Sequence, residues 1–125
     1  IRKIASKHGL VQRVFDSSQY DLIEIGKDVT ISFGVKILVH DFSIKHAARV
    51  ICKEDKVKTS IRKSVKIGNN VFIGAETMIL PGQLYVTIVL CVGGTVIKGK
   101  TDPNGIYAGN PAKRIGCVET FEKNI

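Results

Sequence analysis

The stretch that decides the fold runs from Ile67 to Gly82 and reads IGNNVFIGAETMILPG. Within it an isoleucine returns at every sixth residue, and counting outward by sixes reaches ten positions in the same phase. Eight of those ten are isoleucine, although isoleucine accounts for only 17 of the 125 residues. The ten positions are Ile25, Ile31, Ile37, Ile61, Ile67, Ile73, Ile79, Tyr85, Cys91 and Ile97. A period of six fits neither a helix nor an alternating strand. It is typical of a parallel β-helix in which each hexapeptide forms one side of a narrow prism.

A second set of inward positions accompanies the first, because a narrow prism has room for one branched and one smaller side chain per side. These smaller residues, four positions after the first set, are Val29, Val35, Val65, Val71, Thr77, Val89 and Thr95. Residue types that accept turns at low cost occupy the expected corners. They are Gly26, Asp28, Gly34, Gly68, Asn70, Gly74, Gly82 and Gly94. The sequence therefore predicts an all-β chain of hexapeptide repeats.

The repeat lapses once, between two stretches that share the same phase. The in-phase positions would be Ser43, Arg49 and Asp55, none of which suits a dry core. Ile61 then resumes the count without a shift. We therefore predict that residues 41–60 form an excursion loop that leaves the prism and returns in register. Long loops on compact scaffolds usually carry function.

One coil departs from the pattern, from Gln83 to Val92, where the sequence reads QLYVTIVLCV. Apolar and branched residues replace its expected corner residues, and we expect Val86, Ile88 and Leu90 to point outward. An exposed apolar stripe favours a protein interface. The alternative is a stretch that is tolerated beneath a terminal helix.

The chain suits one domain whose ends need caps, because a solenoid buries its core neighbour on neighbour. We expect an N-terminal cap over residues 1–18, a β-helix domain over residues 19–117, and a C-terminal tail over residues 118–125 with a short helix. The first residue is Ile1 rather than Met, so we interpret the chain as a piece of a longer protein. No apolar run approaches the length of a transmembrane helix.

Three cysteines, Cys52, Cys91 and Cys117, show neither an even count nor metal-ligand spacing. We therefore expect reduced thiols and a cytoplasmic location, with Cys91 filling an inward position. The net charge of +8 raises nucleic-acid binding as a hypothesis, but no recognition motif accompanies the charge, and we expect no nucleic-acid partner. The charge fits a solvated surface, or attraction of a phosphorylated cofactor or of an acceptor at an anionic membrane surface.

Three blocks carry a resemblance to a known family: VHDFS at residues 39–43, IGNNVFIGA at 67–75 and IYAGNPAKRI at 106–115. Together they resemble the hexapeptide-repeat acyltransferases, in particular the branch that O-acetylates sugars of capsules and other cell-surface polysaccharides. The resemblance implies a left-handed parallel β-helix, acetyl-CoA as the donor, and a homotrimer whose active sites lie between subunits. The implied reaction transfers an acetyl group to a sugar hydroxyl.

The resemblance also implies which residue is the catalytic base. The hydroxyl must lose a proton as it attacks the thioester, and a histidine with a pKa near neutrality suits that task. His40 lies in the matched VHDFS block, so the resemblance implies that it is the general base. Asp41 either orients the imidazole or holds the corner through a side-chain-to-backbone hydrogen bond. We interpret His8 as a surface residue and His46 as a loop residue that contacts acceptor or solvent.

A coenzyme A site follows from the same resemblance. Ala75, Gly93 and Gly94 are small residues that let the pantetheine arm approach the backbone, although corner geometry alone also favours small residues there. Lys113, in NPAK, matches a family position near the nucleotide phosphates. Lys98 is a further phosphate candidate, but it opens a Lys-Gly-Lys run where the family commonly has Thr-Lys-Asp. We expect the acceptor to lie under the excursion loop.

Three alternatives stay open. A metal site like that of γ-class carbonic anhydrases uses the same prism, but it needs several histidines that share one metal, and we expect none. A non-catalytic β-helix scaffold would bind no coenzyme A. N-acetylation of an amino-sugar nucleotide would use the same donor and a similar base, and the sequence neither separates it from O-acetylation nor names the sugar.

Overall fold

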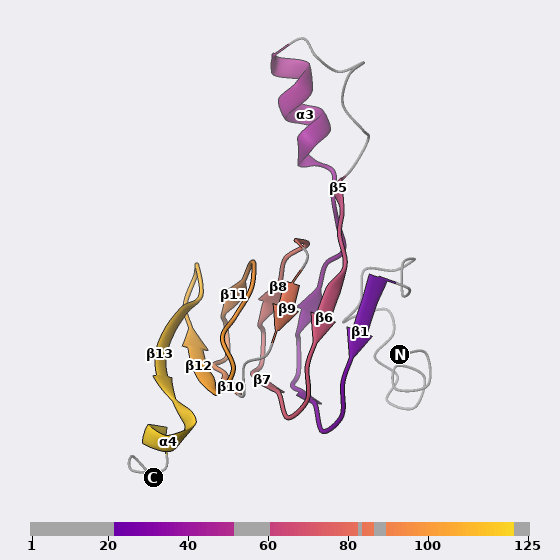
Figure 1. The fold of residues 1–125 in the computed structure, drawn as a ribbon. Helices are drawn as coiled ribbons and strands as arrows, with labels where there is room; N and C mark the ends of the chain where they lie inside the picture. The colour runs from indigo at the N-terminus through magenta and orange to yellow at the C-terminus, as the bar shows by residue number, and fades with distance from the viewer. Residues whose placement is uncertain (1–21, 52–60, 83, 87–89, 122–125) are drawn as a thin grey trace.

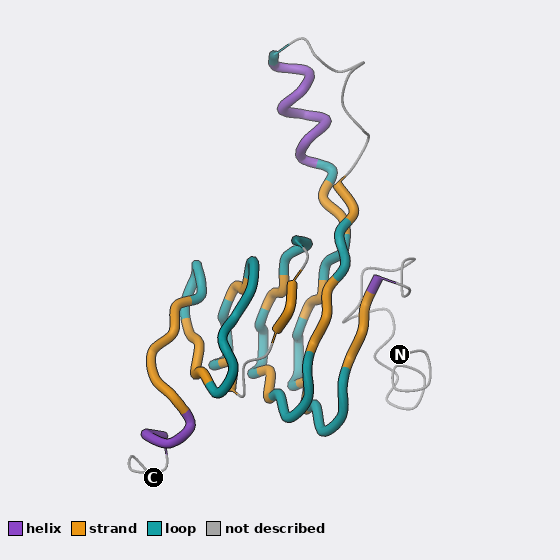
Figure 2. The backbone as a smooth tube through the Cα atoms, viewed as in Figure 1, coloured by secondary structure: helices purple, strands orange, loops and turns teal. Residues whose placement is uncertain are grey.

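The structure is a computed structural model that describes residues 22–51, 61–82, 84–86 and 90–121. The chain winds through three coils that stack side by side (Figure 1). Each coil contributes three short strands that are joined by turns, as Figure 2 shows. The strands are β1 (Ile23–Ile25), β2 (Thr30–Ile31) and β3 (Lys36–Ile37) in the first coil, β6 (Val65–Ile67), β7 (Phe72–Ile73) and β8 (Met78–Ile79) in the second, and β9 (Leu84–Val86), β10 (Leu90–Cys91) and β11 (Val96–Ile97) in the third.

Equivalent strands of successive coils pair in parallel and build three sheets, in the orders β1–β6–β9, β2–β7–β10 and β3–β8–β11. Beyond β10 the second sheet continues with the parallel strand β12 (Gly105–Ala108) and the antiparallel edge strand β13 (Lys113–Cys117). The described chain is therefore mostly β structure in parallel coils, which confirms the predicted architecture at this level.

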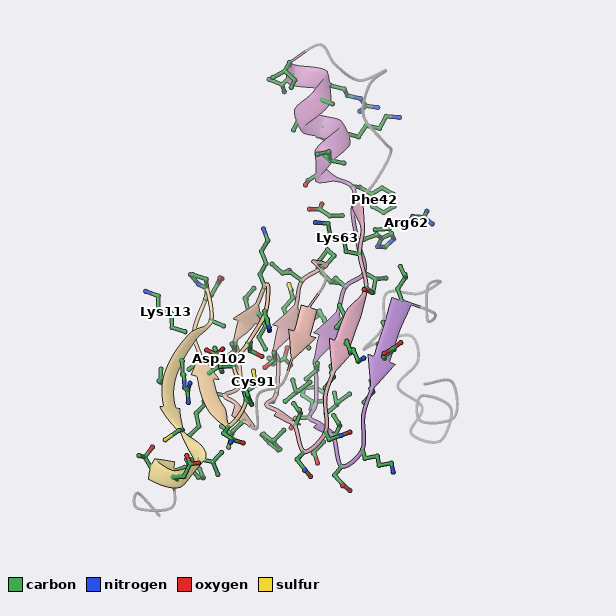
Figure 3. All side chains as sticks on the ribbon, in the orientation of Figure 1. Phe42, Arg62, Lys63, Cys91, Asp102 and Lys113 are labelled. Atoms are coloured by element: carbon green, nitrogen blue, oxygen red, sulfur yellow. The ribbon has the colours of Figure 1, made fainter. Side chains whose placement is uncertain are left out.

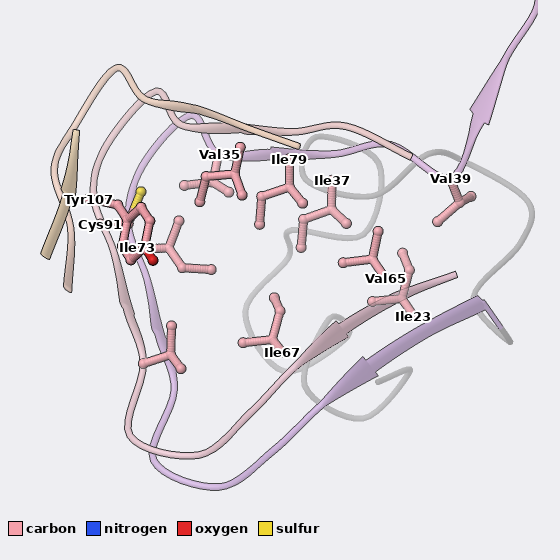
Figure 4. Close-up of a cluster of buried hydrophobic side chains, with 12 residues drawn as sticks. Ile23, Val35, Ile37, Val39, Val65, Ile67, Ile73, Ile79, Cys91 and Tyr107 are labelled. Atoms are coloured by element: carbon pink, nitrogen blue, oxygen red, sulfur yellow. The ribbon is translucent and has the colours of Figure 1, made fainter. Parts of the chain in front are cut away.

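The columns predicted from the six-residue period form the core. Ile37, Ile79 and Ile97 lie opposite one another in the β3–β8–β11 sheet, and all three side chains are buried. Figure 4 shows two of these side chains within the closed outline of the coils. Smaller inward residues that are also buried are Val35, Val65, Val71, Thr77 and Thr95.

The sheet of β2, β7, β10 and β12 has a matching column, which runs from Ile31 through Ile73 and Cys91 to Tyr107. Cys91 is fully buried, as its predicted role as a core filler requires, and burial raises the pKa of its thiol. Tyr107 ends the column, and its hydroxyl oxygen accepts a hydrogen bond of 2.9 Å from the backbone N–H of Asp102.

The third coil departs from the count of six in one sheet. Val86 lies opposite Ile67, and Tyr85 lies opposite the exposed Lys66. The prediction that Tyr85 continues the isoleucine column is therefore wrong. The step from the inward Ile79 to Val86 is one residue longer than the period of six. The step from Val86 to the inward Cys91 is one residue shorter.

Of the three residues predicted to form an outward apolar stripe, Leu90 is the one whose side-chain burial the structure describes. Leu90 is half-buried in β10, where it lies opposite Phe72, whose side chain is exposed. Ile88 lies outside the described residues. Val86 lies opposite the buried Ile67, so the prediction that Val86 occupies an outward position is wrong.

The predicted excursion is an arm that projects from the first coil (Figure 1). The strands β4 (His40–Asp41) and β5 (Ile61–Arg62) pair antiparallel as its stem, and α3 (Ser43–Val50) continues outward from β4. The backbone N–H of Lys63 donates a hydrogen bond of 2.9 Å to the carbonyl oxygen of Val39 and closes the base of the stem.

This arm, residues 40–62, confirms that the chain leaves the coil and returns, but it corrects two details. Ile61 lies in the stem, opposite Asp41, rather than in the core repeat, and the coil resumes with the buried Val65. The arm also contains a helix of eight residues that the sequence did not predict. Because Ile37 and Ile67 lie 30 positions apart, which is five hexads, the count of sixes passes through Ile61 by coincidence of length.

The C-terminal end of the solenoid carries α4 (Val118–Phe121), which confirms the short helix expected in the tail. The backbone N–H of Val118 donates to the carbonyl oxygen of Asn104 at 3.1 Å and ties this helix to the turn before β12. The N-terminal cap expected over residues 1–18 lies outside the described residues. None of the helices in the described ranges has the length and hydropathy that a membrane span requires.

Two glycines show how closely the coils approach. Gly94 has a φ of +74° with no atom within 4 Å of an added Cβ, so its backbone conformation alone favours glycine. At Gly74 an added Cβ would lie 2.5 Å from the backbone nitrogen of Gly93 and 2.6 Å from the carbonyl oxygen of Cys91. The backbone of the next coil therefore leaves no room for a side chain at Gly74.

We predict that Gly74→Ala costs more stability than Gly94→Ala. The Gly94 variant should lose about 1 kcal/mol, since alanine pays only the left-handed penalty. The Gly74 variant should lose about 3 kcal/mol, because two coils must move apart. Urea unfolding of both variants measures the difference, and a larger loss for Gly94→Ala would contradict this view of coil spacing.

Candidate active site

The candidate base lies at the corner where the arm leaves the first coil. His40 directly follows Val39, the last fully buried residue of that face, and it is the first residue of the stem. The residue is half-buried, and the Nδ1 atom of its ring is buried. Its ring also meets the ring of Phe42 edge to face, with centroids 4.7 Å apart and planes at 62°. These contacts limit the orientations that the imidazole can adopt.

Asp41 fixes the start of the helix on the arm. Its Oδ1 atom accepts a hydrogen bond of 2.8 Å from the backbone N–H of Ser43, the first residue of α3. This bond corresponds to the second of the two roles that the sequence left open for Asp41, the bond that holds the corner. The pKa of the exposed carboxyl is lowered, chiefly by that backbone bond, then by the Ser43 hydroxyl, with a smaller contribution from the charge of Lys98.

Lys98 lies on the third coil, at the edge of the β3–β8–β11 face from which the arm leaves the first coil. The backbone N–H of Leu38 donates to Ile79, and that of Leu80 donates to Ile97, both at 2.9 Å, so the ends of β3, β8 and β11 are aligned. Lys98 follows Ile97 directly, its side chain is exposed, and its charge acts on Asp41. The charge of Lys98 therefore acts on Asp41 along one edge of this face, although 57 positions separate the two residues in the sequence.

The three small residues predicted for coenzyme A lie at a different corner, where the chain enters the β3–β8–β11 face. All three are exposed. The backbone N–H of Gly94 donates to the carbonyl oxygen of Ala75 at 2.7 Å, and a Cβ added to Gly93 would lie 3.0 Å from the same oxygen. Ala75, Gly93 and Gly94 are thus stacked on adjacent coils. This corner and the His40 corner flank the two edges of one face.

Lys113 lies at the C-terminal end of the solenoid, as Figure 3 shows. It opens β13 and follows Ala112, whose backbone N–H donates to the carbonyl oxygen of Val96 at 3.0 Å. Lys113 is exposed. It therefore lies beside the third coil, beyond the corner that holds Ala75.

His46 is exposed on α3, whereas His8 lies outside the described residues. Within the described ranges, no three His, Cys, Asp or Glu side chains lie close enough together to hold a metal ion.

No model of a protein family matches the chain. Among curated proteins, the chain is 38% identical to Protein CapG of Staphylococcus aureus over 111 residues, which cover 89% of this chain and 61% of CapG. It is 30% identical over 96 residues to WbbJ of Escherichia coli (strain K12), which carries the provisional name of a lipopolysaccharide biosynthesis O-acetyl transferase. That match covers 74% of this chain and 49% of WbbJ.

Solved structures share the fold. A galactoside acetyltransferase in complex with coenzyme A has a TM-score of 0.67 and 24% identity, over 81% of this chain and 48% of that chain. A hexapeptide-repeat-containing acetyltransferase from Vibrio cholerae has a TM-score of 0.57 and 15% identity, over 94% of this chain and 80% of that chain. The chain is homologous to acetyltransferases and shares the fold of a hexapeptide-repeat-containing acetyltransferase, which is consistent with the family that its motifs resemble. It spans about half to three fifths of the length of the two curated relatives.

Reasoning from the sequence missed two residues beside the candidate site. Phe42 lies within the VHDFS block, but no periodic signal indicated that its ring contacts His40. Glu76 follows Ala75 and has a φ of +60°, at a corner position where neighbouring coils have Gly34 and Gly94. The fixed spacing of the repeat is the signal that would have found it, because a glutamate there breaks the corner pattern.

We predict that the Asp41 carboxyl titrates below its ordinary value of 3.8. The carboxylate then supports the folded arm at higher pH, and this support is lost as the pH falls through the lowered pKa. Ser43→Ala removes the hydroxyl but keeps the backbone N–H, so the pKa should rise only part of the way. A ¹³C NMR titration of both proteins measures these values, and complete recovery to 3.8 in the variant would refute the dominant role of the backbone bond.

Proposed function

We propose that the chain carries the catalytic core of an acetyltransferase that moves an acetyl group from acetyl-CoA to a sugar hydroxyl during synthesis of a cell-surface polysaccharide. The observation that carries this proposal is the position of His40 at the corner where the arm leaves the coil, in a chain homologous to acetyltransferases. The provisional name of WbbJ supports the acceptor class. The proposal includes left-handed winding of the coils, which the family resemblance implies.

In the proposed reaction His40 is the general base. Its imidazole removes the hydroxyl proton as the sugar oxygen bonds to the thioester carbonyl carbon. The carbon–sulfur bond then breaks, and the proton passes from the imidazolium to the departing thiolate, which yields an acetyl ester and coenzyme A. Burial of Nδ1 and the contact with Phe42 support this role, since a base must be held in one orientation.

Asp41 is a positioning residue in this proposal. Its bond to the backbone of Ser43 fixes the start of α3 next to the base, so the carboxylate acts on the arm rather than on substrate. Lys98 acts on Asp41 across the coils, which favours a role for its charge at the acyl-transfer end of the site. Of the two predicted phosphate contacts, Lys113 then remains the candidate for the nucleotide end.

We propose that acetyl-CoA lies along the β3–β8–β11 face, with its pantetheine arm against Ala75, Gly93 and Gly94. The exposure of these residues and their small side chains support close approach to the backbone. Corner geometry explains Gly94 as well, because its φ of +74° favours glycine with or without a ligand. Ala75 is therefore the more informative residue, since it has no positive φ to explain its small size.

A homotrimer in which neighbouring copies complete each site is part of the proposal. The exposed apolar side chains of Phe72 and Val92, at 41% and 39%, support an interface on the sheet that contains β7 and β10. Sedimentation of the protein during turnover tests the shared site, and a monomer that still consumes acetyl-CoA would exclude it.

We predict that His40→Gln lowers kcat for acetyl transfer by about 10²–10⁴-fold. The KM for acetyl-CoA should stay the same, because the base is not a binding residue for the donor. Release of coenzyme A against a panel of sugars measures both. His8→Gln, which changes the histidine that we interpret from the sequence as a surface residue, is the matched control and should keep parental activity. Unchanged kcat in His40→Gln would remove His40 from its role.

We predict that Ala75→Leu weakens coenzyme A binding by about tenfold or more, since the longer side chain blocks approach to the backbone. Calorimetric titration with coenzyme A measures the affinity without turnover. Ala47→Leu, a change of equal size at an exposed position of α3, should bind like the parent. His40→Gln should also bind normally, and parental affinity in Ala75→Leu would contradict the assigned donor path.

A further inference from the structure

The outer end of the arm is apolar. Val50 and Ile51 lie where α3 ends, and their side chains are 84% and 61% exposed. Val50 is the most exposed of the large apolar side chains in the described ranges. Figure 1 shows that this end of α3 is the part of the helix farthest from the coils. The acetyl-transfer chemistry proposed above makes no use of either side chain.

The arm is also basic. The described residues of the arm and its base, 40–51 and 61–63, contain four Lys or Arg and one Asp, a net charge of +3. Helix α3 has no acidic residue and contributes Lys45 and Arg49. Figure 3 shows Arg62 and Lys63 near the stem.

Aliphatic residues at the tip, with cations along the same arm, form the combination that binds an anionic lipid surface. Anionic head groups attract Lys and Arg, while the interface accepts exposed aliphatic side chains. A soluble anion would engage the cations but would give no stabilisation to Val50 and Ile51. We propose that the arm binds the surface of an anionic lipid bilayer, with Val50 and Ile51 inserted among the head groups.

The length of α3 determines how far such a bilayer would lie from the His40 corner. The eight residues of α3 span roughly 12 Å. Because the stem begins at His40, a bilayer that holds the tip of α3 would lie about one helix length from that corner. The bilayer contact does not depend on acetyl transfer, so lipid binding and activity can fail separately.

The absence of tryptophan from the chain permits a direct experiment. Val50→Trp places one fluorophore at the tip, and Ile115→Trp places one at a comparably exposed position on β13. Each variant is mixed with phosphatidylcholine vesicles, with or without phosphatidylglycerol. We expect a blue shift, and quenching by brominated lipid, only for Val50→Trp with anionic vesicles, and both effects should weaken as salt rises. Equal shifts in both variants, or none in either, would overturn the proposal.

Cosedimentation separates the apolar and charged contributions. Val50→Ser combined with Ile51→Ser should lower vesicle partitioning by about tenfold or more. Lys45→Gln and Arg49→Gln should each lower it by about fivefold. Lys27→Gln and Ile115→Ser, on the solenoid, are the matched controls and should bind like the parent. If the serine variant binds anionic vesicles and dextran sulfate as well as the parent does, the arm recognises a soluble polyanion instead.

Discussion

The structure depends on the stacking of each coil on the backbone of the next. The inward side chains are held in fixed positions, because Ile37, Ile79 and Ile97 stack directly on one another inside the coils. The coils are also joined by backbone hydrogen bonds of about 2.9 Å at nearly every strand. At Gly74 this approach excludes even a methyl group. A six-residue period is therefore a requirement of packing, since a residue out of phase would meet the backbone or leave a void.

This constraint confines chemistry to the corners and to the arm. Strands of two or three residues offer few outward positions, while a corner can present backbone groups and any side chain that accepts its conformation. The β3–β8–β11 face has both kinds of corner at its edges: the small residues around Gly93 at its entry and His40 with Lys98 at its exit. Residues distant in the sequence lie along one edge there because the coils repeat, and the charge of Lys98 acts on Asp41 along that edge.

The sequence predicted the parts of the fold that packing makes periodic, and missed those that only local interactions decide. The inward columns and the excursion followed from the period. The stem and α3 did not, because their combined length preserved the phase and hid Ile61 among the core positions. The shift at Val86 was missed for a similar reason, since one longer link and one shorter link together restored the phase by Cys91. For the site, motif resemblance indicated His40 and Asp41, but the contacts with Phe42 and Ser43 required coordinates.

The arm shows how such a rigid scaffold can acquire a variable element. The coil is interrupted between Val39 and Lys63, and one backbone hydrogen bond of 2.9 Å rejoins those two residues. Because the ends of the excursion are held together, its interior can change in length and composition at a small entropic cost that grows only slowly with loop length. The solenoid then keeps its register whatever the arm contains. Basic and apolar residues can therefore accumulate on the arm beside His40 without disturbing the columns that hold His40 in place.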